Sequence, residues 1–267
     1  MLSAILIGLG VGAIMGITGA GGGVLAVPAL VAGLGLSMQQ AAPVALLAIA
    51  SAAGAGAIEG LRHGLVRYRA AMLVALVSLP FTLVGVSAAH ALPHERVMQI
   101  FVIVMLITAV RSWRQSAQAG GHDATATLCA LGPIHPYSGR FIWTATTAGV
   151  LGSIGAVTGF MAGLLGVGGG FIIVPMLGRF TQLSAHGRVA TALLVIALIS
   201  VGGVLSNLWH GVEMSLSLGV VFTLSAVSGM LASRRLAHFL SPAHVQRAFA
   251  LLLLCVALGL GIQSLRS

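Results

Sequence analysis

The chain carries very little charge. Charged residues make up 6% of its 267 residues, whereas a soluble domain has about 25%. It contains no lysine, so its 13 basic residues are all arginine, and only 4 residues are acidic. So few charged side chains cannot cover a soluble body of this size, which all but excludes a water-soluble monomer.

Acidic residues are absent from the middle of every apolar run. The four are placed at predicted loops or helix ends: Glu59, Glu95, Asp123 and Glu213. This placement argues against a sodium or proton site built on a buried acid. It also removes the paired carboxylates of a membrane hydrolase, and neither H-E-x-x-H nor G-x-S-x-G occurs. We therefore predict that the protein is not an enzyme.

Metal and cofactor motifs are also missing. Cys129 and Cys255 lie far apart and form no metal-binding spacing. A P-loop needs the lysine that this chain lacks. The stretch Gly21–Ala26 fits G-x-G-x-x-A, but Leu46 stands where a dinucleotide site needs an acid, and the second copy, Gly168–Ile173, fails the pattern. We expect no metal and no cofactor.

The chain is rich in apolar residues, at 58%, with a mean hydropathy of +1.08. The thirteen arginines are spread through apolar sequence and make no basic stripe, so nucleic acid is not an expected partner. Most of the apolar runs are near the length of a transmembrane helix. These features predict an all-α polytopic membrane protein in contact with lipid, with runs at about 2–36, 40–58, 70–89, 97–111, 141–183, 187–206, 214–232 and 245–263.

The chain repeats itself at an offset of 147 residues. Gly16–Leu30 aligns with Gly163–Leu177 with eight of fifteen positions identical, and His63 aligns with His210 at the same offset. The polar stretch between the halves contains prolines, which suits a linker. We predict a first transmembrane repeat at 1–114, a linker at 115–140 and a second repeat at 141–267.

The arginines predict how the runs cross the membrane. If all eight runs cross once, the arginines divide seven to six between the two sides, which is no bias. If each glycine-broken run returns to its own side, eleven lie on one side, and only Arg96 and Arg266 lie on the other. Arginine is enriched in cytoplasmic loops, which favours the hairpins and places the linker in the cytoplasm. The arginine count requires only that the second glycine-broken run returns to its own side. The sequence repeat then argues that the first run does the same.

Each half then makes three full crossings, an odd number, so the two halves enter the membrane from opposite sides. Each half is then a glycine-broken hairpin plus three transmembrane helices, and the two form an inverted-topology repeat. Secondary transporters often use this plan. Alternating access follows from it, because the two halves can exchange conformations around a site between them.

The glycine-rich tips are the main candidates for that site. A helix that begins just after Gly23 or Gly170 would present free backbone N–H groups and a positive dipole end to an anion. The alternative is that the glycines only allow close helix packing. The candidate substrate-binding residues in the tips are Gly19, Gly21, Gly22, Gly23, Gly166, Gly168, Gly169 and Gly170, with Pro28 and Pro175 expected to mark the helix breaks.

Polar side chains inside the apolar runs add further candidates. Thr18, Ser51, Ser200 and Asn207 could donate hydrogen bonds to an anion, or bond to carbonyls of their own helices. His63 and His210 occupy equivalent places in the two halves. They are candidates for a gate or a proton relay, with ordinary interfacial side chains as the alternative.

The doubled motif G-x-x-G-x-G-G-G-x-x-x-V-P-x-L resembles the TauE/SafE family of sulfite exporters and toluenesulfonate uptake permeases. Ser51–Gly54, His63–Arg67 and Leu92–Pro93 are also similar to that family. The resemblance implies a multi-pass protein of the bacterial inner (cell) membrane that moves sulfur-containing or other small organic anions.

The sequence therefore predicts a secondary transporter for a small anion such as sulfite, a sulfonate or sulfoacetate. It would work by alternating access around the two glycine-rich breaks. The competing interpretation is a membrane scaffold or assembly subunit that transports nothing and uses its glycines for helix packing. A homodimer is compatible with the sequence, although nothing in it requires one.

Overall fold

The fold is helical throughout the described residues. The computed structural model describes residues 2–118, 144–180, 185–212, 215–237 and 242–266, and these contain no strand. The predicted all-α class is thereby confirmed. The elements are α1 (Leu2–Thr18), the 3-10 helix η1 (Gly19–Leu25), α2 (Ala26–Leu34), α3 (Met38–Arg62), α4 (Tyr68–Ala91), α5 (His94–Gln118), α6 (Ala145–Leu165), α7 (Gly170–Phe180), α8 (Ala185–Trp209), α9 (Leu216–Ala237) and α10 (Pro242–Arg266).

Six of the described helices are long and apolar enough to cross a membrane: α3, α4, α5, α6, α8 and α9. Five of them correspond to predicted crossings, and α6 is the first arm of the second predicted hairpin. The sixth predicted crossing corresponds to α10, in which the described stretch Val245–Gly261 is also an apolar helix. The protein is thus a multi-pass membrane protein. Most of the predicted linker is outside the described residues, although α5 continues to Gln118.

Local sequence signals explain where several helices begin and end. Ser37 caps α3 through a capping box with Gln40. The Thr144 hydroxyl accepts a hydrogen bond from the backbone N–H of Thr147 at the start of α6. Gly35 and Gly166 follow α2 and α6 in the left-handed conformation, which glycine adopts at little cost and which ends a helix.

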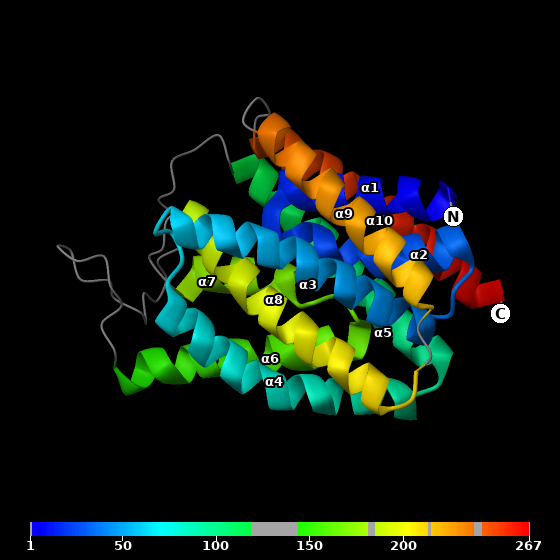
Figure 1. The fold of residues 1–267 in the computed structure, drawn as a ribbon, viewed down its shortest axis with the longest axis horizontal. Helices are drawn as coiled ribbons and strands as arrows, with labels where there is room; N and C mark the ends of the chain where they lie inside the picture. The colour runs from blue at the N-terminus through cyan, green and yellow to red at the C-terminus, as the bar shows by residue number, and fades with distance from the viewer. Residues whose placement is uncertain (1, 119–143, 181–184, 213–214, 238–241, 267) are drawn as a thin grey trace.

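The chain turns back on itself twice. Figure 1 shows α1 running inward from the N-terminus, and η1 with α2 leading the chain back toward the same end of the bundle. Helices α6 and α7 make a similar turn from the opposite end (Figure 1). Helix packing does not assign either end to a side of a membrane, so the inverted topology stays a prediction.

The two halves are interleaved. Helix α1 packs against α9 as α6 packs against α4, and α3 contacts α9 as α8 contacts α4. Helix α3 packs against α8, and α5 packs against α10. Exchanging the halves converts the first two of these pairings into one another and the next two into one another, and it leaves α3 with α8 and α5 with α10 unchanged. The core therefore lies between the halves, where small movements of one half change contacts with the other.

Two stripes of glycine bring the helices of different halves together. A Cβ atom on Gly12 of α1 would overlap the carbonyl oxygen of Ala226 on α9, and one on Gly159 of α6 would overlap that of Ser78 on α4. Small residues spaced by four are a common means of close packing between membrane helices. The packing of these stripes was not predicted, although the 147-residue offset relates them: Gly8, Gly12 and Gly16 to Gly155, Gly159 and Gly163.

Candidate functional site

The second glycine tip is a turn made by residues of positive φ. Gly166, Gly168 and Gly169 have φ values of 69°, 71° and 72°. Only glycine adopts this region readily. Helix α7 begins at Gly170, and the backbone N–H groups of Ile172 and Ile173 donate to the carbonyl of Gly169. The N–H groups at the very start of α7 have no intrahelical partner.

The first tip has a different conformation. Its residues form the 3-10 helix η1, in which Gly19 alone has positive φ, at 74°. Gly22 packs against the preceding helix, since a Cβ there would lie 2.5 Å from the Cα of Met15. Helix α2 begins at Ala26, later than the predicted start after Gly23. The equivalent motifs of the two halves are therefore not in equivalent conformations.

The prolines of the motif do not form the breaks. Pro28 is in the first turn of α2, where a missing N–H removes no intrahelical bond. Pro175 lies within α7. Both breaks are instead formed by glycine-rich segments, at 19–25 and 166–169.

The two tips lie against each other in the core. A Cβ on Gly23 would lie 3.4 Å from the carbonyl oxygen of Val167, so the first tip touches the second. The side chain of Ile49 on α3 lies beside both, because it would contact a Cβ on Gly23 or on Gly168. Gly22, Gly23 and every residue from Gly166 to Gly170 are buried. The breaks thus come together in the interior between the halves.

Three of the four predicted polar ligands donate to their own helices. The hydroxyl of Thr18 donates to the carbonyl of Ile14 at 2.7 Å, and that of Ser51 to the carbonyl of Leu47 at 2.9 Å. The side-chain amide of Asn207 donates to the carbonyl of Gly203 at 2.8 Å. The two hydroxyl donors, and one of the two amide N–H groups of Asn207, are therefore already used in this conformation.

Ser200 is the exception among these ligands. It is fully buried, and its hydroxyl has no hydrogen-bond partner. A buried polar group without a partner is costly. The hydroxyl lies at the second tip, since a Cβ on Gly168 would be 2.7 Å from Ser200 Oγ. The structure thus separates Ser200 from the other hydroxyls by leaving its donor free beside the break.

A cavity of about 540 Å³ lies beside the tips. It is enclosed by the ends of α1 and η1 and by parts of α5, α6, α7 and α10. Four predicted site residues line it, namely Thr18, Gly21, Gly170 and Pro175, whereas Ser51, Ser200 and Asn207 do not. Asn207 instead lines a much smaller pocket that also includes His90.

Polar residues of α5 and α10 that were not predicted also line this cavity. They are Thr108, Arg111, Ser112 and Gln246. The Ser112 hydroxyl donates to the backbone carbonyl of Gln246 at 3.2 Å, and Oε1 of Gln246 is buried without a partner. Arg111 was counted in the sequence only as a topology marker. No sequence signal shows that the end of one apolar run meets the start of another 134 residues later.

His210 contacts a second histidine at one end of the bundle. Its ring stacks on that of His90, with centroids 5.0 Å apart and planes at 7°. Its Nδ1 lies 2.8 Å from the carbonyl of Ser206, and its Nε2 lies 3.4 Å from the hydroxyl of Ser87. The stack joins the end of α8 to the end of α4. His63, its counterpart in the repeat, is exposed after the end of α3.

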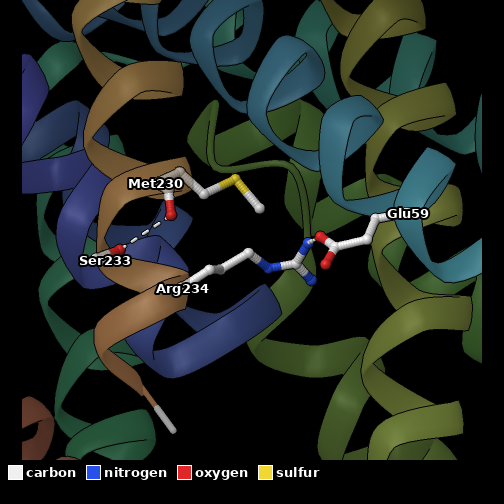
Figure 2. Close-up of polar contacts among 4 residues, drawn as sticks. All are labelled: Glu59, Met230, Ser233 and Arg234. Carbon is white, nitrogen blue, oxygen red and sulfur yellow. Dashed lines mark hydrogen bonds and ion pairs between the residues drawn. The ribbon is translucent and has the colours of Figure 1, made fainter.

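An ion pair occupies the repeat-equivalent place at the other end. Figure 2 shows the Arg234 side chain of α9 reaching the carboxylate of Glu59 on α3, and it is the sole ion pair among the described residues. The offset of 147 relates Glu59 to Ser206, and Arg234 to Ser87. Both of these serines contact His210. The place equivalent to the ion pair at the other end is therefore bridged by His210, which contacts both serines.

Comparison with known proteins gives a consistent result. The family model described as sulfite exporter TauE/SafE matches residues 4–260. A "Probable membrane transporter protein" of Xylella fastidiosa strain Temecula1 is 25% identical over 254 residues, which is 93% of this chain and 90% of the relative. The protein of the same description in strain 9a5c is 25% identical over 255 residues, with the same coverage.

A third relative matches a shorter part of the chain. A "Probable membrane transporter protein" of Methanocaldococcus jannaschii is 36% identical over 74 residues, or 28% of this chain and 26% of the relative. No solved structure matches this chain. The family and the relatives indicate a membrane transporter and not an enzyme. With the match covering nearly its whole length, the chain belongs to the sulfite exporter TauE/SafE family.

Proposed function

We propose that the protein is a secondary transporter for a small anion, either sulfur-containing, such as sulfite, a sulfonate or sulfoacetate, or another organic anion. One observation supports this most directly. The two glycine breaks meet in the buried core, beside a cavity that includes the first residues of α7. A transporter that binds its substrate between two halves needs such a position for its site.

The chemistry at this position favours a negative charge. Gly170 and Phe171 line the cavity at the start of α7, where free N–H groups and the helix dipole attract anions. No carboxylate is among the described residues that line the cavity. The free hydroxyl of Ser200 behind Gly168 can support the turn or donate to the substrate as the tip moves.

Alternating access would use the exchange symmetry of the packing. In this conformation the cavity reaches the first turn of α7 after the second tip, whereas the first tip is a packed 3-10 helix that contributes Gly21 to the lining. In the alternate conformation, the tips would exchange these roles. By the positive-inside rule, the end with Glu59 and Arg234 would be cytoplasmic together with the linker. The resemblance to the TauE/SafE family implies the bacterial inner membrane as the location.

The two end contacts are the proposed gates. The stack of His90 on His210 would close the outer end, and the pair of Glu59 with Arg234 would tie the inner end. His63 lies at that inner end. Rocking one half against the other would open one of these two contacts while retaining the other.

Fixing the histidine contact should stop transport. In a variant lacking Cys129 and Cys255, we expect His90→Cys with His210→Cys to be joined by a short thiol cross-linker, and flux to fall at least tenfold until the cross-link is cleaved. The physical reason is that α4 and α8 could then no longer separate. The single His90→Cys variant, treated in the same way, controls for the reagent. Full flux after complete cross-linking would contradict the gate.

Flux itself is the test of the proposed function. Purified protein in liposomes should transport at least one member of a panel of sulfite, sulfoacetate, alkanesulfonates and short carboxylates, and empty liposomes should not. Counterflow of the same anion would show that the protein is a carrier and not a channel. The absence of flux and of binding across the panel would overturn the proposal and leave the scaffold interpretation.

A further inference from the structure

We infer that Arg111 recognises the charged group of the substrate, and that the cavity selects organic anions with an apolar body over inorganic oxyanions. This inference rests on the proposed function and names the substrate class for the same site. It depends on the size of the cavity, on the residues that line it and on the placement of its one cation.

The size of the cavity is that of an organic molecule. Its volume of about 540 Å³ falls within the range of roughly 300–1,000 Å³ typical of pockets for organic ligands. An inorganic oxyanion of four or five atoms would leave most of this space to water. The remaining space can stabilise a substrate only if the substrate has further atoms to fill it.

The lining is chiefly apolar. Side chains from four helices contribute, namely Ile107, Val157, Met161, Ile172, Val174 and Phe249. An apolar wall gives no binding energy to a hydrated oxyanion, but it gains about 0.8 kcal/mol for each methylene group that leaves water. The wall therefore favours a hydrocarbon or aromatic body.

Arg111 is the one charged residue among the described residues of the lining. No described carboxylate pairs with it, since the sole ion pair among the described residues joins Glu59 to Arg234. The next residue, Ser112, is hydrogen-bonded to the backbone of Gln246, which ties this part of α5 to α10. The Oε1 atom of the Gln246 side chain is buried and has no hydrogen-bond partner. An amide can turn to present its N–H groups, so Arg111 and Gln246 together offer donors to a sulfonate or carboxylate.

Arg114 provides a matched control. It is also an exposed arginine of α5, close to Arg111 in the chain, but it does not line the cavity. Charge near this end of the bundle is reduced equally by Arg111→Gln and by Arg114→Gln. Any difference between the two variants therefore reports contact with the substrate and not the general positive potential.

The experiment measures binding of n-alkanesulfonates from methane- to hexanesulfonate, with sulfite, to the full chain in nanodiscs. We expect affinity to rise about fourfold per methylene, the equivalent of about 0.8 kcal/mol, with sulfite weakest. Arg111→Gln should weaken every sulfonate about 10- to 100-fold, as expected for losing hydrogen bonds from a charged group, and should leave the chain-length slope unchanged. Arg111→Lys should restore part of the affinity, and Arg114→Gln should bind like the parent protein.

The outcomes separate this inference from the proposed function. If liposomes show flux but affinity is the same from sulfite to hexanesulfonate, the apolar-body selection is wrong although the protein is a transporter. If Arg111→Gln and Arg114→Gln weaken binding equally, Arg111 is not the recognition residue. If a nanodisc lipid occupies the cavity, the affinity would also be the same across the series of anions, and that result would overturn the inference. No flux and no binding of any anion would overturn the proposed function itself.

Discussion

Replacing Gly12 with isoleucine should prevent α1 from packing on α9. A Cβ at this position would overlap the carbonyl oxygen of Ala226, and both contacting groups are backbone, so no side-chain rotation relieves the overlap. Overpacking in a tight core costs about 1–3 kcal/mol, and occasionally more. We expect Gly12→Ile to cost about 3 kcal/mol or more. This cost would be seen as loss of the monodisperse peak in detergent or as a large fall in Tm.

The same helix supplies the control for this variant. Gly10→Ile adds the same side chain to α1, but a Cβ on Gly10 meets nothing within 4 Å. The second half repeats the design, with Gly159→Ile expected to fail and Gly152→Ile expected to be tolerated. Equal stability of Gly12→Ile and Gly10→Ile would show that α1 does not lie on α9 as described.

Gly168→Ala should remove most transport while leaving the protein folded. Gly168 has a φ of 71°, a region that costs a residue with a Cβ roughly 1–2 kcal/mol. The added Cβ would also lie 2.7 Å from Ser200 Oγ and 2.9 Å from a methyl group of Ile49. We expect the turn to shift away from its present geometry and substrate flux to fall at least tenfold.

The measurement for Gly168→Ala combines flux with Tm. Gly54→Ala is the control, because Gly54 lies inside α3, and a Cβ there meets nothing within 4 Å. It should retain full flux. A second variant, Ser200→Ala, removes the unpartnered hydroxyl without adding volume, and should alter flux with little loss of stability. Normal flux in Gly168→Ala would show that the shape of the second tip is not needed for transport.

Much of the architecture could be read from the chain. The hydropathy of the runs predicted the helices, and the Gly-Gly-Gly triplets predicted interruptions near residues 19–25 and 166–169. Both effects are local, because a run of apolar side chains favours lipid and a run of glycines permits backbone conformations denied to other residues. The family resemblance was also confirmed, since its doubled motif spans both halves.

The details of the site could not be read in the same way. Ser51 and Ser200 are the same residue type in corresponding helices, but the first donates to its own helix and the second has no partner. The rotation of each helix against its neighbours decides such a difference. Arg111 was overlooked for the same reason, because its role depends on a cavity formed by helices from both halves.

The sequence by itself determined the membrane environment, the repeat and the position of the breaks. These properties depend on residues that are neighbours along the chain or on their simple count. The tertiary structure alone decided which glycines bring helices into contact, which hydroxyl lacks a partner, and which arginine lines a cavity. Those properties arise between segments that are distant in the sequence, where packing geometry sets the distance between groups and composition does not.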